Sequence, residues 1–93
     1  MKLEHTNLES KGFFRVIDNS VEAGKMTYSW AGKDKFIIDH TEVSQAYNGK
    51  DVGKMMVMEA VKFARENDIK IIPLCPFAKS VFLKQEGLTD VLA

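Results

Sequence analysis

The period of the hydrophobic residues changes once along this chain, and that change limits the folds it can adopt. Residues 13–18, 26–30 and 36–43 are rich in aromatic and β-branched side chains, and short turn sequences separate them. This pattern is typical of β-strands. We therefore predict three strands joined as an antiparallel meander. Tyr28 and Trp30 share one strand face with Met26, which favours core packing over a ligand-stacking surface.

From residue 51 the hydrophobic period becomes 3.6, which predicts an amphipathic helix that ends at Asn67–Asp68. A short apolar strand at 70–75 follows, and Pro76 opens a second amphipathic helix for which Gly87 is a plausible stop. Residues 36–75 thus form a βαβ unit with two parallel strands and a right-handed crossover. The predicted fold class is α+β. The residues that we expect on the buried half of the first helix are Val52, Met56, Val57, Ala60, Val61, Phe63 and Ala64.

Length and charge limit the function. The 93 residues fit one compact domain, residues 1–93. Thirteen basic residues balance thirteen acidic ones, so nothing favours a nucleic-acid partner. No apolar run reaches the ~18 residues of a membrane span, and the polar N-terminus lacks the apolar segment of a signal peptide. A single cysteine, Cys75, excludes an internal disulfide and a multi-cysteine metal site. We expect a cytoplasmic protein without a metal site.

The loop at residues 46–54 is the first candidate binding site. It joins a strand to the long helix, contains Gly49 and Gly53, and carries Lys50 and Lys54. Free N–H groups at a helix N-terminus attract anions, and glycines let a ligand approach the backbone. The alternative is an ordinary loop in which the glycines only form a turn.

Four segments carry a family resemblance: residues 38–43 (IDHTEV), 48–53 (NGKDVG), 64–67 (AREN) and 72–77 (IPLCPF). Together they resemble the GNAT superfamily of acyl-CoA-dependent N-acetyltransferases, in particular its short, single-domain bacterial branch, often called YjdJ-like. The likeness extends from about Phe13 to Phe82. It implies a GNAT-like fold in which the meander leads into a βαβ unit with a splayed parallel strand pair and a C-terminal helix.

The resemblance also implies where acetyl-CoA binds. In the family, backbone amides of an Arg/Gln-x-x-Gly-x-Gly/Ala loop hold the pyrophosphate, and the pantetheine arm pairs with strand backbone in the V of the splayed pair. Asn48 and Asp51 depart from the family pattern, whereas Gly53 matches it. The residues expected to bind the cofactor are Thr41, Glu42, Val43, Asn48, Gly49, Lys50, Asp51, Val52, Gly53 and Lys54.

Three side chains are candidates for chemistry in the V. His40 and Glu42 are two residues apart and share a strand face, and either is suited to take a proton from an amine. The alternatives are a structural histidine and a solvated carboxylate. Cys75 ends the second parallel strand, where it is either a nucleophile that accepts the acetyl group or a small buried apolar residue.

The sequence therefore predicts an acetyl-CoA-dependent N-acetyltransferase that transfers the acetyl group directly to an amine. The acceptor is unknown: a protein lysine, a polyamine and a small amine fit about equally well. The sequence does not indicate an oligomeric state. Two alternatives stay open: a CoA- or acyl-CoA-binding module without turnover, and a protein-interaction domain that has lost CoA binding.

Overall fold

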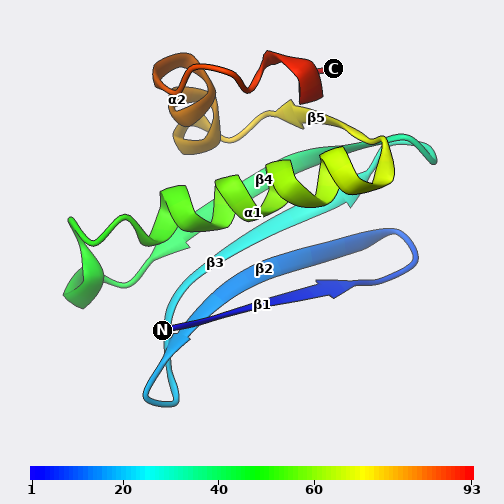
Figure 1. Ribbon diagram of the computed structural model, residues 1–93. Coiled ribbons are helices and arrows are strands. Elements are labelled where there is room, and N and C mark those ends of the chain that lie inside the picture. Colours follow the sequence, from blue (N-terminus) through cyan, green and yellow to red (C-terminus); the bar gives the residue numbers. More distant parts are fainter.

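The computed structural model describes all 93 residues as one five-stranded sheet with helix α1 packed across one of its faces (Figure 1). The strand order is β1-β2-β3-β4-β5; the first four strands are antiparallel, and β5 is parallel to β4. This confirms the α+β class, the meander and the βαβ unit. The elements are β1 (Lys2–Asn7), β2 (Lys11–Asp18), β3 (Val21–Trp30), β4 (Lys35–Val43), α1 (Val52–Asn67), β5 (Lys70–Pro73) and α2 (Pro76–Lys84), with short 3-10 helices at Gln45–Tyr47 and Thr89–Val91.

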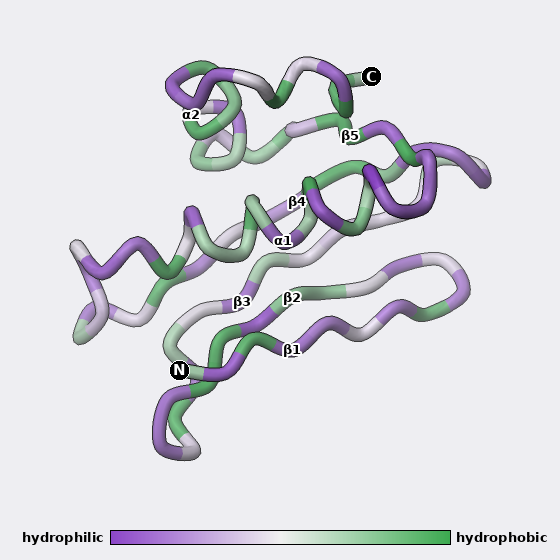
Figure 2. Tube along the Cα trace, in the orientation of Figure 1, coloured by the Kyte–Doolittle hydropathy of each residue, from purple (hydrophilic) through white to green (hydrophobic).

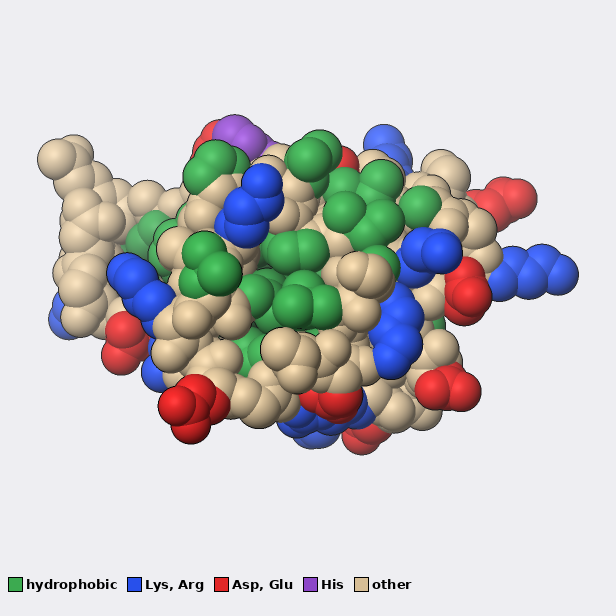
Figure 3. Space-filling view, turned by 90° about the horizontal axis from the view of Figure 1, so that it is seen from above, with side chains coloured by type: hydrophobic (Ala, Val, Ile, Leu, Met, Phe, Trp, Pro, Cys, Tyr) green, Lys and Arg blue, Asp and Glu red, His purple; other side chains and the backbone are tan.

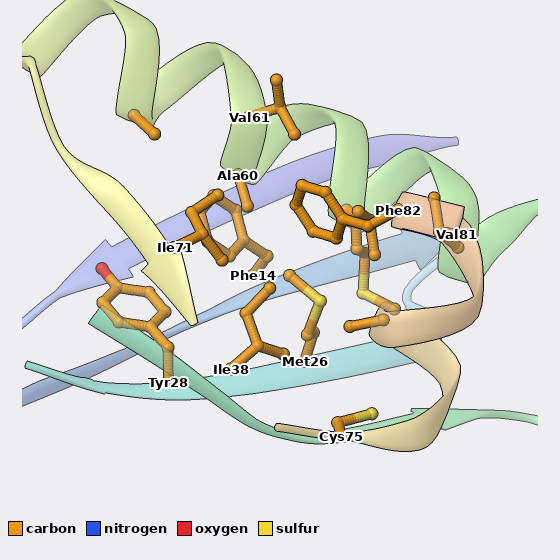
Figure 4. Close-up of a cluster of buried hydrophobic side chains, with 14 of the residues drawn as sticks. Phe14, Met26, Tyr28, Ile38, Ala60, Val61, Ile71, Cys75, Val81 and Phe82 are labelled. Atoms are coloured by element: carbon orange, nitrogen blue, oxygen red, sulfur yellow. The ribbon is translucent and has the colours of Figure 1, made fainter. Parts of the chain in front are cut away.

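One hydrophobic core lies between α1 and the sheet and extends to α2 (Figure 4). Figure 2 shows why: hydrophobic and hydrophilic residues alternate along α1 and the central strands, so each element has one apolar side. The predicted buried half of α1 is confirmed, except that Phe63 is only partly buried. Tyr28 is 1% exposed and Trp30 packs against the core, as predicted. Neither helix has the length and apolar composition needed to cross a bilayer.

Several elements differ from the prediction. Strand β3 begins at Val21 and not at residue 26, and β5 ends at Pro73 and not at residue 75. The meander has a fourth strand, β1, which pairs with β2 at the edge of the sheet. Its residues are polar or only half-buried, because an edge strand has one neighbour and contributes little to the core. Helix α2 ends at Lys84, with Gln85 in an extended conformation. Gly87 has φ 81° and lies in the following turn, so it does not stop the helix.

A β-bulge in β4 decides which side chains face α1. Tyr28 of β3 lies opposite Ile38, but Thr27 lies opposite His40, so Asp39 has no partner in the register. Side chains alternate between the two faces of a strand, and one extra residue reverses the alternation. Ile38 and Thr41 therefore share the α1 face, although their numbers differ by three.

Strands β4 and β5 separate at the bulge, and the separation itself was predicted. Their parallel pairing runs from Lys35 opposite Lys70 to Ile38 opposite Pro73. The N–H of Cys75 then donates to the carbonyl of Ile38 at 3.1 Å, and the chain turns away into α2. The second half of β4 continues with β3 on one side and an open edge on the other.

Candidate functional site

A cleft of about 570 Å³ opens where β4 and β5 separate. It lies between the end of β4, the following loop, the first turn of α1 and one side of α2. The residues that line it are Thr41, Val43, Tyr47, Asn48, Gly49, Asp51, Val52, Gly53, Lys54, Phe77, Ser80, Val81, Lys84 and Gln85. The structure thus brings the predicted loop and the predicted strand end together at one cavity.

The N-terminus of α1 presents free amides to this cleft. Asp51 precedes the helix with φ 60° and ψ 24°, and its carboxylate caps no amide. The first backbone bond of the helix runs from the N–H of Met55 to the carbonyl of Asp51. The N–H groups of Val52, Gly53 and Lys54 therefore have no acceptor within the protein. Free amides at a helix N-terminus carry partial positive charge and bind anions.

Side-chain charges modify this anion site. Lys54 and Lys84 line the cleft, whereas Lys50, which was expected to bind the cofactor, does not. The carboxylate-bearing Asp51 also lines it and partly offsets the two lysines. The local charge from these side chains is thus positive but small.

Gly53, which was predicted to bind the cofactor, also has a packing role. A Cβ atom at this position would lie 2.5 Å from Cζ of Phe77. The missing side chain therefore lets the Phe77 ring of α2 rest on the first turn of α1. This contact sets the width of the cleft between the two helices.

The open edge of β4 supplies backbone groups to the cleft. The N–H of Ser44 donates to the carbonyl of Ala23 on β3 at 2.8 Å. Alternate residues of an antiparallel strand bond to the same neighbour, so His40 and Glu42 pair toward β3. Thr41 and Val43 direct their backbone groups to the open side. Of the three strand residues expected to bind the cofactor, Thr41 and Val43 thus direct their backbone groups to the cleft, whereas Glu42 directs its own to β3.

His40 and Glu42 lie together, but not in the cleft. His40 Nε2 is 3.0 Å from Glu42 Oε1, and the two side chains are 67% and 77% exposed. The bulge at Asp39 turns both side chains to the face of the sheet opposite α1. The expectation that they share a cavity with Cys75 is therefore wrong for the side chains. They flank the open edge of β4 from the other side.

Cys75 lies at the rim of the core, where β5 leads into α2 (Figure 4). It is 5% exposed, and its thiol donates to the hydroxyl oxygen of Thr41 at 3.3 Å. Thr41 itself lines the cleft. The packing interpretation fits this burial, and the contact with Thr41 keeps the thiol next to the cleft.

Sequence reasoning missed the contribution of α2. Phe77 and Lys84 line the cleft, although the sequence identified this segment only as an amphipathic helix. It also missed Tyr47, whose hydroxyl donates to Asp18 at 2.8 Å and ties the loop to the end of β2. This hydrogen bond raises the pKa of Tyr47. No local sequence pattern pairs residues 29 positions apart.

Hydrophobic side chains are also exposed around α2 (Figure 3). Leu83 is 83% exposed, Leu74 60% and Phe77 39%. Only Phe77 of these three lines the cleft. No three His, Cys, Asp or Glu side chains come together as ligands for a metal ion.

Comparisons with known proteins agree with this fold. A family model described as GCN5-related N-acetyl-transferase matches residues 13–91. Protein NATD1 of Danio rerio is 27% identical over 85 residues, which cover 91% of this chain and 76% of that protein. The solution structure of a GCN5-like protein from Staphylococcus aureus superposes with a TM-score of 0.74 and 36% identity, covering 98% of this chain and 88% of the other. An aminoglycoside N-acetyltransferase in complex with CoA shares the fold at 12% identity and a TM-score of 0.59, covering 82% and 66% of the two chains.

Proposed function

The chain belongs to the GCN5-related N-acetyltransferase family, and from this we propose that it transfers the acetyl group of acetyl-CoA to an amine. One observation carries the proposal. The free amides at the start of α1 and the open edge of β4 border the same cleft. An anion site next to an unpaired strand edge suits a ligand with a diphosphate and an extended amide-containing arm.

In this proposal the donor lies along the cleft. The amides of Val52, Gly53 and Lys54 hold the diphosphate, and Gly49, with φ 79°, leaves the loop backbone accessible. The pantetheine arm pairs with the backbone of Thr41 and Val43, as an added strand would. The thioester then lies near the point where β4 and β5 separate.

The acceptor amine approaches the same gap from the opposite face of the sheet. Its nitrogen attacks the thioester carbonyl carbon; a C–N bond forms, the C–S bond breaks, and the CoA sulfur leaves with the bonding pair. The proton lost by the nitrogen passes to the His40–Glu42 pair and from there to the thiolate. The pair flanks the open edge and is accessible to solvent. Position and backbone hydrogen bonds supply the rest of the catalysis.

The second candidate is a module that binds CoA or acyl-CoA without turnover. The carboxylate of Asp51 favours it, because this residue lines the cleft at the start of the anion site. The burial of Cys75 also disfavours catalysis through an acetylated thiol, which agrees with a module that only binds. The two candidates share the binding site and differ only in catalysis.

An NMR titration with acetyl-CoA tests the shared site. We expect the largest amide shifts at Thr41, Val43 and residues 49–54. Shifts that instead cluster on β1–β3 would contradict the donor site. Release of free CoA in the presence of a panel of amines then separates an acetyltransferase from a binding module.

A Cys75→Ala variant completes this experiment. We expect it to release CoA with an amine at a rate close to that of the wild type, with no acetyl group added to the wild-type protein in intact mass spectra. An acetylated wild-type protein and an inactive variant would instead assign the chemistry to the thiol.

A further inference from the structure

The face of the sheet opposite α1 carries a second cavity, a groove of about 440 Å³. No helix crosses this face of β1–β4 (Figure 1). Six of the residues that line the groove are Lys11, Phe13, Lys25, Thr27, Ser29 and Asp39. They extend across β2, β3 and the bulge of β4.

The side of the groove formed by β2 and β3 is cationic and aromatic; Lys11 lies opposite Ser29, and Lys25 lies opposite Arg15. Lys25 Nζ lies 4.5 Å from the centre of the Phe13 ring, and Lys11 lies on the same strand as Phe13. Neither lysine forms an ion pair within the chain, whereas the nearby Arg15 is bound by Glu4 at 2.7 Å and Glu22 at 3.8 Å. Two ammonium groups are thus free to bind an anion.

The β4 side of the groove is anionic and adjoins the His40–Glu42 pair. Ser29 donates to the carboxylate of Asp39 at 2.5 Å, which fixes the carboxylate in the groove. Thr27, which lines the groove, lies opposite His40 in the register, and Lys25 lies opposite Glu42. An amine held on this side is next to the pair that accepts its proton in the proposed reaction.

We propose that this groove selects the acceptor: an amine that carries an anionic group, either a carboxylate or a phosphate. Its ammonium or amine end binds at Asp39 and His40–Glu42, and its anionic end binds Lys25 and Lys11. Strands in a sheet are about 4.8 Å apart. Lys25 is one strand from β4 and Lys11 is two, so the amine and the anionic group of the acceptor should be about 5 to 10 Å apart. The inference rests on the proposed acetyl transfer and adds the class of acceptor.

The test compares matched amines. We would measure acetylation of γ-aminobutyrate against butylamine, and of glucosamine phosphate against glucosamine, at low salt. Each anionic member should react about fivefold faster in kcat/KM than its partner, the effect of one solvated ion pair. The pair that shows the preference distinguishes a carboxylate from a phosphate. Equal rates within both pairs would overturn the proposal.

Two variants locate the preference. Lys25→Gln keeps part of the aliphatic stem on Phe13 and should remove most of the preference for the anionic member of each pair. Lys62→Gln on the exposed side of α1 is the matched control and should leave the preference unchanged. The proposal is wrong if both variants behave alike.

A direct titration separates this proposal from acetyl transfer itself. The anionic amines, added to the free protein without acetyl-CoA, should shift the amides of Lys25, Thr27 and Asp39. If these shifts occur and no amine is acetylated, the proposed acetyl transfer fails and the groove stands as a binding site. If acetyl-CoA binds in its cleft and the amines cause no shift on this face, the groove proposal fails alone.

Discussion

The two ends of helix α1 are stabilised very differently. At the C-terminal end, the N–H groups of Asp68 and Ile69 both donate to the carbonyl of Ala64, and the Asn67 side chain donates to the carbonyl of Phe63. Arg65 also donates to Asp90 and to the carbonyl of Gly87. At the N-terminal end, no side chain caps the free amides.

The surroundings of the two ends of α1 differ in the same way: side chains pack closely around the C-terminal end, whereas the N-terminal end faces the cleft. Near the C-terminal end, His5 stacks on Phe14 with ring centres 4.0 Å apart and contacts Phe63 edge-on at 4.6 Å. Tyr28 bonds His5 and Asn7, and burial raises the pKa of Tyr28 to about 12. This closed end stabilises the fold, and the open end keeps its hydrogen-bond donors for a ligand.

The largest expected difference between the ends is in stability. Phe14→Ala removes a fully buried ring and should lower the free energy of unfolding by about 3 to 5 kcal/mol. Phe77→Ala at the cleft is the matched control. Its ring is 39% exposed, so we expect a loss below about 1.5 kcal/mol. Urea titrations measure the free energy of unfolding of both variants. Similar losses would show that the cleft contributes as much to stability as the closed end does.

The sequence predicts the fold well because hydrophobic period is a local property. The period change at residue 51 and the short apolar strand at 70–75 suffice for the βαβ unit. Strand β1 was not predicted because an edge strand needs little hydrophobic pattern. Its packing on the rest of the protein depends on His5, which contacts Phe14 and Phe63, residues distant in the sequence.

The site is less predictable because one bulge reverses which face of the sheet the side chains at the end of β4 point to. Without the bulge at Asp39, His40 and Glu42 would lie on the α1 face with Ile38, as the alternation of the sequence implies. The bulge is visible only in the register with β3. The glycine-containing loop was found because its signal is local, whereas the lysine and phenylalanine from α2 reach the cleft only through tertiary packing.

The second prediction uses the two left-handed aspartates at the ends of α1. Asp51 has φ 60° and Asp68 has φ 57°, so glycine relieves backbone strain at both positions. Only Asp51 lines the cleft. Asp51→Gly removes a charge and a side chain near the diphosphate and should tighten acetyl-CoA binding about three- to tenfold at low salt. Asp68→Gly should leave the affinity unchanged.

Calorimetric titration at two salt concentrations measures both variants. The gain in Asp51→Gly should shrink at higher salt, since screening weakens the repulsion. Thermal stability should not fall, because the Asp51 carboxylate caps no amide. Unchanged or weaker binding would mean that this carboxylate points away from the phosphates, or that the first turn of α1 does not hold them.

The smallest expected effect is a pH dependence at the closed end. Burial lowers the pKa of His5 below its usual 6.5, and Glu59 only partly opposes this. The unfolded chain therefore binds more protons than the folded one at a pH between the lowered value and about 6.5. Stability is complete above that window and falls as the pH drops through it.

His5→Gln tests this effect, because glutamine can still bond the Tyr28 hydroxyl but does not titrate. Wild type should lose more stability than the variant between about pH 7.5 and pH 5.5, by less than about 1 kcal/mol because the ring is only half-buried and solvent screens it. Urea midpoints of both proteins at the two pH values measure the difference. His40 is present in both proteins, so it does not affect the comparison. Equal losses would show that a charged His5 is tolerated among the aromatic rings, and that the closed end is more open to water than its packing indicates.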